Sequence, residues 1–221
     1  MADQAEGIPI AKEGLPLILF GGLATLGCWW AGWIWPTCVI GSTTLFTTWF
    51  FRNPAREIPT GDGLIVSPGD GTVVAVEKEF EHRFLKEPSV RISIFLNVFN
   101  VHINRMPVGG TIQDVAYQPG QFLVARQPEA SAANEQNAVM ILREDGQKVL
   151  CVQIAGLIAR RIVCWVVAGE KVKKGERFGL IQFGSRMDVY LPESSAMMVN
   201  IGDKVKGGSS ILAELPCAEI S

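Results

Sequence analysis

The sequence predicts a mainly β (α+β) domain that follows an N-terminal helical hairpin lying in a membrane. One observation is that the stretch from Gly14 to Phe51 contains no charged residue. A second is that the rest of the chain consists of short segments rich in β-branched residues, separated by turns with Gly, Asn and Asp. A third is a glycine-flanked turn sequence that occurs twice in the C-terminal part. Together they place a membrane segment before a β-rich domain.

Composition narrows the classes of function. The chain has 221 residues, a formal net charge of -2 and 48% hydrophobic residues, which is high for a purely soluble protein. The length suits one domain with an appendage. The near-neutral charge gives no support for nucleic-acid binding, which usually needs a basic face. Only two histidines, His82 and His102, are available for acid–base chemistry near neutral pH.

The five cysteines form no CxxC pair, and we interpret them as reduced packing residues. Neither a disulfide framework nor a zinc site is expected from their spacing. They are Cys28, Cys38, Cys151, Cys164 and Cys217.

The uncharged stretch is roughly forty residues long, whereas one membrane-crossing helix needs about 20. Within it, a cluster of four tryptophans is followed by a proline: Trp29, Trp30, Trp33, Trp35 and Pro36. Tryptophan favours the membrane–water interface, and proline interrupts a helix. We therefore expect a hairpin that turns near Trp33–Pro36, with a short, Thr-rich second arm that could be re-entrant. A buried helix pair in a soluble protein is the alternative.

Two arginines, Arg52 and Arg56, follow the apolar stretch directly, which favours the cytoplasmic side for the rest of the chain. A cleaved signal peptide fits poorly, because the leading residues are not basic and the apolar stretch is too long. We accordingly predict a membrane anchor over residues 1–51 and a β-rich domain over residues 52–221.

The predicted β domain begins after the proline-marked linker 52–59. Strands LIVSP and TVVAVEKEF flank the turn Gly69-Asp70-Gly71, and Val90–Ile103 reads as one long apolar strand. A hairpin is expected at Asp145-Gly146. A helical pattern covers Gly156–Cys164.

An internal repeat links two turns: GEKVKKG at 169–175 recurs as GDKVKGG at 202–208. Its glycines permit positive φ, and the valine between them is expected to pack inward. Two such copies, each followed by an apolar strand, suggest a sandwich or barrel with approximate two-fold character. The repeat resembles the turns of barrel-sandwich hybrid domains. Two ordinary hairpins with similar turns are the alternative.

Three segments carry candidate chemistry. Asp70 lies in the turn SPGDG, where Asp-Gly is usually structural. His102 lies in an apolar segment, and a two-residue period puts Asn100 and Asn104 on its face. Such a polar stripe must be solvated or line a site. The third candidate is a Gly-Ser pair, which occurs at Ser185 and again at Ser209. Composition alone does not show which of the two serines is functional.

Taken together, these segments resemble the phosphatidylserine decarboxylase family in its short bacterial form. The resemblance covers nearly the whole chain and rests on the N-terminal hairpin and on RNPAREIP, SPGDGTV, FLNVFNVHINRMPVGG, NEQN at 134–137, AGLIARRIV and GERFGLIQFGSR. The family's processing site is usually Leu-Gly-Ser-Thr, and here it reads Phe183-Gly184-Ser185-Arg186. Its position after the first repeat turn favours Ser185 over Ser209.

The resemblance implies a lyase made as a zymogen. Autocatalytic serinolysis at Gly184–Ser185 would convert Ser185 into a covalent pyruvoyl cofactor and leave residues 1–184 and 185–221 as a heterodimer. His102, oriented by Asp70, would act as the base. Longer members carry a second His where this chain has Arg105, so one histidine would serve both maturation and turnover.

The resemblance also implies decarboxylation of phosphatidylserine to phosphatidylethanolamine and CO2, a step of phospholipid biosynthesis. The substrate amine would form a Schiff base with the pyruvoyl ketone, and His102 would return a proton to the α-carbon. No metal is expected.

The expected partners are the lipid substrate and membrane lipid, with no nucleic acid. Drawing a two-tailed lipid out of a bilayer into water costs about 0.8 kcal/mol per CH2. We therefore expect catalysis at the membrane surface, on the cytoplasmic side of the bacterial inner membrane. Further homo-oligomerisation is left open. Candidates to hold the headgroup are Asn104, Arg105, Arg126, Arg160 and Arg161. The alternative for the arginines is that they are ordinary surface charges.

Two other functions compete with the decarboxylase. The repeat favours a membrane-tethered binding or adaptor module without catalysis. A biotin or lipoyl carrier is disfavoured, because 188–200 contains no acceptor lysine. A serine hydrolase using Ser185, His102 and Asp70 is the other candidate, although Gly-Ser-Arg lacks the GxSxG elbow.

Overall fold

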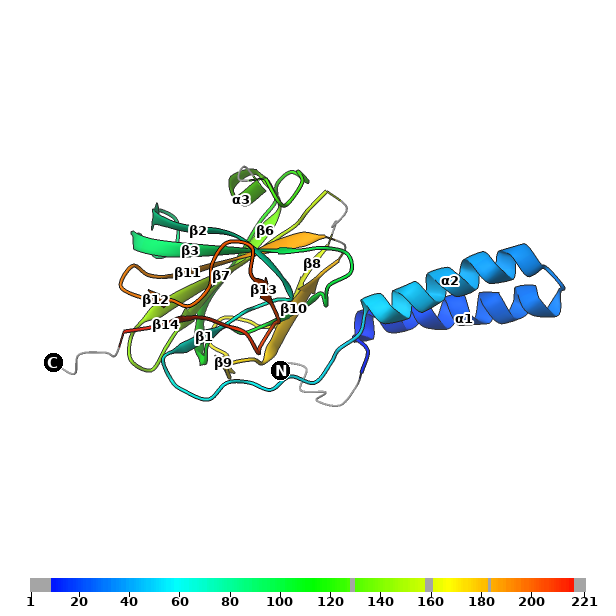
Figure 1. The fold of residues 1–221 in the computed structure, drawn as a ribbon, viewed down its shortest axis with the longest axis horizontal. Helices are drawn as coiled ribbons and strands as arrows, with labels where there is room; N and C mark the ends of the chain where they lie inside the picture. The colour runs from blue at the N-terminus through cyan, green and yellow to red at the C-terminus, as the bar shows by residue number, and fades with distance from the viewer. Residues whose placement is uncertain (1–8, 128–129, 158–160, 183, 217–221) are drawn as a thin grey trace. The chain divides into compact units, whose positions relative to one another are not determined.

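The computed structural model describes residues 9–127, 130–157, 161–182 and 184–216. The chain divides into two compact units between Ala55 and Arg56 (Figure 1). This division lies a few residues beyond the predicted end of the N-terminal segment at residue 51. The first unit is helical and the second, from Arg56 onward, carries the strands, so the predicted mainly β class is confirmed.

The helical unit is a hairpin, as predicted. A 3-10 turn, Lys12–Gly14, leads into α1 (Leu15–Trp30), and α2 (Ile34–Phe50) returns. Gly32 makes the connecting turn with a φ of 74°. Pro36 lies in the first turn of α2, where its missing N–H costs no helical hydrogen bond, rather than in the connecting turn. Within the described ranges, no helix is both long enough and apolar enough to cross a membrane.

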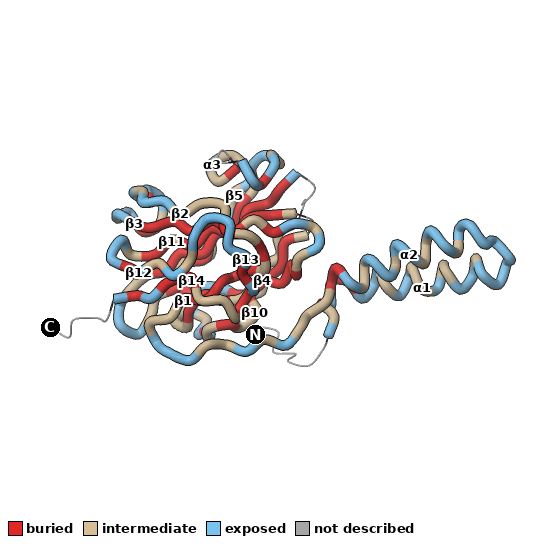
Figure 2. The backbone as a smooth tube through the Cα atoms, in the orientation of Figure 1, coloured by how far each residue is buried: buried red, intermediate tan, exposed pale blue. Residues whose placement is uncertain are grey.

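Small residues bring α1 and α2 together. A Cβ added to Gly21 would lie 2.3 Å from Thr44 Oγ1, and one on Gly41 would lie 3.3 Å from Thr25 Cγ2. The threonine hydroxyls donate to carbonyls four residues earlier, as Thr44 does to Ile40 O at 2.8 Å, which satisfies them within the helix. Large apolar side chains therefore point outward, and no residue of α1 is buried (Figure 2).

In the described part of the second unit, the regular elements are β-strands and one short helix, α3 (Ala130–Ala133). The strands are β1 (Leu64–Val66), β2 (Gly71–Glu81), β3 (Glu87–Leu96), β4 (Ile103–Arg105), β5 (Gly110–Gln118), β6 (Gln136–Leu142), β7 (Lys148–Ile154), β8 (Ile162–Cys164), β9 (Lys171–Val172), β10 (Arg177–Ile181), β11 (Ser185–Pro192), β12 (Ala196–Met197), β13 (Lys204–Val205) and β14 (Ile211–Glu214).

The strands form one large sheet and two small ones, all antiparallel. The large sheet has the order β13-β2-β3-β11-β7-β6-β5-β9, and the small sheets are β4-β10-β8 and β1-β14-β12. Buried segments run through all three sheets (Figure 2). The shared core includes Ile65, Ile94, Leu96, Met106, Ile141, Phe178, Met187 and Val189. The strand β11 lies between β3 and β7, in the middle of the large sheet.

The two copies of the repeat occupy equivalent places. β9 closes one edge of the large sheet against β5, and β13 closes the other edge against β2. In each case the buried valine of the repeat lies opposite a glycine: Val172 opposite Gly110, and Val205 opposite Gly71. The predicted inward valines are confirmed, whereas the two-fold character of the domain and the likeness to barrel-sandwich hybrids stay predictions.

Two elements differ from the predictions. The segment Val90–Ile103 is not one strand, because β3 ends at Leu96 and β4 starts at Ile103. Between them, Asn97 Oδ1 accepts from the Phe99 N–H at 2.8 Å and Asn100 Oδ1 accepts from the Asn97 N–H at 2.9 Å. Asparagine side chains that bond the backbone locally compete with a strand. Asn100 therefore lies in a turn and not on the strand face of His102.

The helix expected over Gly156–Cys164 is also wrong. Its last residues, Ile162–Cys164, form β8 and pair with β10. Gly156 and Leu157 lie outside any helix, and residues 158–160 fall outside the described ranges. A glycine at the start of a short apolar run left the periodicity ambiguous between helix and strand.

Candidate active site

Ser185 is a buried hydroxyl at the start of β11. Its residue is 0% exposed, and its Oγ has no hydrogen-bond partner among the described residues. On one side its backbone pairs with Leu96 of β3. Leaving a buried hydroxyl unpaired costs about 1–3 kcal/mol, so such a group calls for a functional explanation.

Gly184, the residue before it, has a left-handed backbone with a φ of 72°. Its N–H donates to His102 Nε2 at 3.4 Å. Its carbonyl oxygen lies against Gly156, where an added Cβ would approach to 2.2 Å. Both glycines are therefore needed by geometry: Gly184 for its φ, and Gly156 for the space beside the Gly184 carbonyl.

His102 lies just before β4 and is only 3% exposed. Its Nδ1 lies 2.9 Å from the carbonyl oxygen of Asn100. A proton on Nδ1 donates to that carbonyl and leaves the Nε2 lone pair facing Gly184, an assignment made from the hydrogen bonds. The turn that breaks the predicted strand thus presents a basic nitrogen to the residue before Ser185.

Asp70, in the SPGDG turn, is bound by residues of two other segments. Arg56 Nη2 lies 2.8 and 2.7 Å from its two carboxylate oxygens, and the Gly207 N–H donates to Oδ1 at 2.8 Å. This ties the linker, the SPGDG turn and the second repeat together. The group that the structure shows at His102 Nδ1 is the Asn100 carbonyl, which sequence reasoning missed. Orientation of His102 by Asp70 stays a prediction.

Ser209 is an ordinary turn residue. It follows Gly208 in the second repeat as Glu176 follows Gly175 in the first. The two turns make matching bonds, from the Ser209 N–H to Lys206 O at 3.1 Å and from the Glu176 N–H to Lys173 O at 3.1 Å. Ser209 therefore belongs to a repeat turn, whereas Ser185 begins a strand outside the repeats.

The candidate headgroup residues lie in different surroundings. Arg105 donates from Nη1 to Gly175 O at 2.9 Å and lies against Gly208, so it packs among the repeat turns. Asn104 is fully buried, and its Oδ1 accepts from Gln153 Nε2 at 2.8 Å. Its Nδ2 has no partner within the described part of the chain.

Two of the candidate arginines, Arg126 and Arg161, are exposed. The remaining one, Arg160, lies outside the described residues, as does Phe183 of the processing motif.

Asn134 braces the loops around Gly184. Its Nδ2 donates to Leu123 O at 2.9 Å and to Ala155 O at 2.7 Å, and its Oδ1 accepts from the Leu123 N–H at 2.9 Å. One amide thereby fixes the loop before Ala125 against the residue next to Gly156. Sequence reasoning noted the NEQN segment but assigned it no role. A fully satisfied buried amide joining two loops is visible only in the fold.

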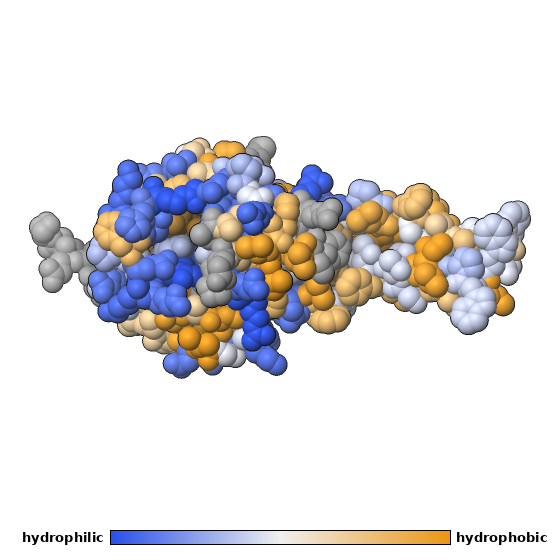
Figure 3. Space-filling model, turned by 90° about the horizontal axis from the view of Figure 1, so that it is seen from above, coloured by the Kyte–Doolittle hydropathy of each residue, from blue (hydrophilic) through white to orange (hydrophobic). Residues whose placement is uncertain are grey.

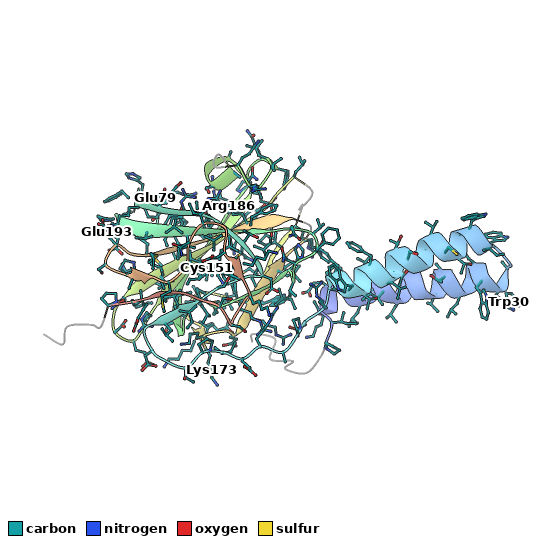
Figure 4. The ribbon with its side chains drawn as sticks, in the orientation of Figure 1. Trp30, Glu79, Cys151, Lys173, Arg186 and Glu193 are labelled. Carbon is teal, nitrogen blue, oxygen red and sulfur yellow. The ribbon has the colours of Figure 1, made fainter. Side chains whose placement is uncertain are left out.

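Arg186, which is labelled in Figure 4, begins a buried ionic network directly after Ser185. It is 2% exposed and donates to Asp188 Oδ1 at 2.6 Å, to Ser93 Oγ at 2.6 Å and to Gln127 O at 3.3 Å. Ser131 Oγ donates to the other Asp188 oxygen at 2.8 Å. The guanidinium of Arg186 and the hydroxyl of Ser131 each donate to an acceptor in this network. The network therefore fixes the position at which β11 starts.

The low polarity around this network also raises the pKa values of two neighbouring side chains. Burial raises the pKa of the Cys151 thiol, and the Asp188 carboxylate raises it further. Burial and Asp188 likewise raise the pKa of the Tyr190 hydroxyl. Both groups stay neutral near pH 7, so they serve as packing residues beside the network rather than as nucleophiles.

Comparison with known proteins gives consistent matches. The family model described as phosphatidylserine decarboxylase matches residues 43–213. A protein named phosphatidylserine decarboxylase proenzyme from Syntrophus aciditrophicus (strain SB) is 48% identical over 92% of this chain and 96% of its own length. Proteins of the same name from Ralstonia pickettii (strain 12J) and Desulfotalea psychrophila (strain LSv54 / DSM 12343) are 50% and 40% identical. These matches cover 93% and 94% of this chain, and 95% and 97% of those proteins.

Proposed function

Because the chain belongs to the phosphatidylserine decarboxylase family, we propose that Ser185 is the residue through which it processes itself and becomes active. The chain decarboxylates phosphatidylserine, which yields phosphatidylethanolamine and CO2, and it is made as a proenzyme. The observation that carries the assignment of Ser185 is its buried hydroxyl without a described partner, beside a glycine whose amide meets His102.

In the first step of maturation, Ser185 Oγ attacks the carbonyl carbon of Gly184. A serine hydroxyl needs an adjacent base to do so. His102 Nε2, which accepts from the N–H of Gly184, is the basic nitrogen that contacts the residue before Ser185, and it would take the Oγ proton and pass it to the leaving nitrogen of Ser185. The C–N bond breaks as the C–O bond forms, so the peptide becomes an ester. The missing side chain at Gly156 leaves the place that the Gly184 carbonyl oxygen occupies.

In the second step, the Ser185 α-carbon loses its proton and the Gly184 carboxylate leaves from the β-carbon. Residues 1–184 end in that carboxylate, and residue 185 is left unsaturated. Water then replaces the nitrogen, which departs as ammonia, and a pyruvoyl group blocks residue 185. A fully buried position suits such a group, since its carbonyls are shielded from bulk water.

When formed, the pyruvoyl group supplies a ketone for the substrate amine and draws off the electrons left by departing CO2. The residues of the chain bind the substrate and orient it. His102 Nε2, which accepts from the Gly184 N–H, would hold the proton that the α-carbon must receive. For the headgroup, Asn104 offers a buried amide donor and Arg126 an exposed cation, whereas Arg105 is already bonded to Gly175.

The Arg186 network keeps the new N-terminus in place. Cleavage frees residue 185 from residue 184, and a free strand end tends to fray. Arg186 is held on three sides within one residue of that end. The family motif usually has Thr at this position. The arginine found here therefore supports the assignment of Ser185 instead of weakening it.

We also propose that residues 1–51 anchor the chain to the bacterial inner membrane, with the catalytic unit on the cytoplasmic side. The outward-facing large apolar side chains of α1 and α2 support this, because a hairpin of this kind is stable only when another apolar phase covers it. Arg52 at the end of the hairpin supports the orientation.

The test is an activity assay on the purified full chain, which follows loss of phosphatidylserine and appearance of phosphatidylethanolamine. Ser185→Ala should abolish turnover, and Ser209→Ala should leave it unchanged. A Ser185→Ala protein that still makes phosphatidylethanolamine would refute the assignment of Ser185. The adaptor alternative would require that the wild-type chain make none.

A further inference from the structure

Three loops converge on the Gly184–Ser185 bond. A Cβ added to Gly184 would have Val98 Cγ1 as its neighbour at 3.9 Å. One added to Gly156 would meet the Gly184 oxygen at 2.2 Å and Ala125 Cβ at 3.2 Å. The turn after β3 and the segment after β7 thus lie against Gly184, and the loop before α3 lies against Gly156 beside them.

Each of these loops also presents an apolar side chain to solvent, one residue away from its contact with the site. Phe99 is 64% exposed, Val124 44% and Leu157 60%, whereas their neighbours Val98 and Ala125 are half-buried and buried. Isolated exposed apolar residues are normal, but three around one site indicate a binding surface. Figure 3 shows that hydrophobic side chains gather in patches on the face of the second unit that it displays.

Positive charge accompanies these side chains. Arg126 is exposed and follows Ala125 directly. Arg161 is exposed as well, and its carbonyl accepts from the Gln182 N–H at 3.3 Å, two residues before Gly184. An apolar rim with adjacent cations is complementary to a bilayer that exposes anionic headgroups above hydrocarbon.

We propose that Phe99, Val124 and Leu157 form a membrane-contact rim that docks the catalytic unit on an anionic lipid surface around Ser185. The proposal rests on the proposed function, since it concerns how a lipid substrate reaches that residue. Insertion of the rim would bring Ser185 to the headgroup level, so that the acyl chains stay in the bilayer while the serine headgroup enters. Arg126 and Arg161 would add an attraction that salt screens.

The experiment compares two forms of the substrate on the full chain. One is short-chain phosphatidylserine below its micelle concentration, and the other is long-chain phosphatidylserine in vesicles with phosphatidylcholine. The rim variant is Phe99→Ser/Val124→Ser/Leu157→Ser. The matched control is Phe80→Ser/Val167→Ser/Ile201→Ser, which replaces residues that are also exposed. Phe80 pairs with Pro88 at the opposite end of β3 from Leu96, about 25 Å away at 3.3 Å per residue.

The rim variant should process normally and turn over the soluble substrate as the wild type does, but lose at least about tenfold in turnover on vesicles. The control should match the wild type on both. Unchanged vesicle turnover by the rim variant would overturn the proposal and leave the function standing. Equal losses on both substrates would also overturn it, because the rim would then line the pocket.

Two further outcomes are decisive. A wild-type chain that turns over neither substrate would remove the proposed function and the rim with it. A change in oligomeric state of the rim variant, with no selective vesicle defect, would assign the rim to a second protein copy. If the proposal is right, added salt should lower wild-type vesicle turnover, and Arg126→Gln/Arg161→Gln should weaken that dependence.

Discussion

The absence of a side chain at Gly156 determines the position of the scissile carbonyl. Gly156→Ala would put a Cβ 2.2 Å from the Gly184 oxygen, so the carbonyl must shift by about 1 Å to reach ordinary contact. A displacement of that size can cost about 100-fold in rate. We expect Gly156→Ala to fold but to accumulate as uncleaved precursor, which a time course of cleavage on denaturing gels would measure.

The control for this variant is Gly109→Ala. An added Cβ there would meet no atom closer than 3.4 Å, so cleavage should proceed at the wild-type rate. If Gly156→Ala were cleaved as fast as Gly109→Ala, the close approach to Gly184 would have no part in maturation.

Arg186 should be the most costly single charge to remove. Arg186→Met leaves Asp188 buried without its main partner, and breaking a buried pair costs about 3–5 kcal/mol. In an uncleaved Ser185→Ala background, we expect a loss of that size in the free energy of unfolding, measured by chemical denaturation. Lys78→Met, which removes the exposed pair with Glu193, should change it by less than about 1 kcal/mol. Equal effects of the two variants would contradict the account of the network.

The residue types of the site could be read from the sequence, but their contacts could not. The resemblance picked out Ser185, His102 and Asp70. It did not reveal Asn100 O as the partner of His102 Nδ1, because a backbone carbonyl leaves no mark in a sequence. Arg186 looked like a mere departure from a motif, since burial of a charge depends on strands far away in the chain.

At the scale of elements, the hairpin is held by small residues. Gly21→Leu would push a side chain into Thr44 and separate α1 from α2, and overpacking of this kind costs about 1–3 kcal/mol. We expect the amides of both helices to exchange hydrogen about tenfold faster or more in detergent, as measured by mass spectrometry. A Cβ added to Gly22 would meet nothing within 4 Å, so Gly22→Leu should leave exchange unchanged. Identical exchange in the two variants would mean that Gly21 does not form the helix contact.

Strong local signals predicted elements well, and weak ones did not. The helical hairpin was expected from the long uncharged stretch with its tryptophans and proline. The Asp145-Gly146 turn and the repeated lysine turns were expected from their glycines, which act locally. The break at Asn97 and Asn100 and the strand at Ile162–Cys164 were missed. Each depends on side-chain bonds or pairing with distant strands, which override local periodicity.

At the scale of the whole molecule, cleavage should not release the two chains. Residues 185–192 form β11, which is hydrogen-bonded to β3 and β7, and β14 pairs with β1. A tag on the C-terminal fragment should therefore retain residues 1–184 in native buffer, and only denaturant should separate them, as seen on a gel of the eluted fractions. Separation in native buffer would contradict the central position of β11.

The central claim is that Ser185 is converted in place, and intact-mass analysis of the purified chain tests it most directly. We predict two fragments split between Gly184 and Ser185. The smaller should be lighter by one ammonia than a fragment that starts with serine, and it should react with a hydrazine. Ser185→Ala should remain a single chain. A split before Ser209, or a single uncleaved chain in an active preparation, would contradict this account.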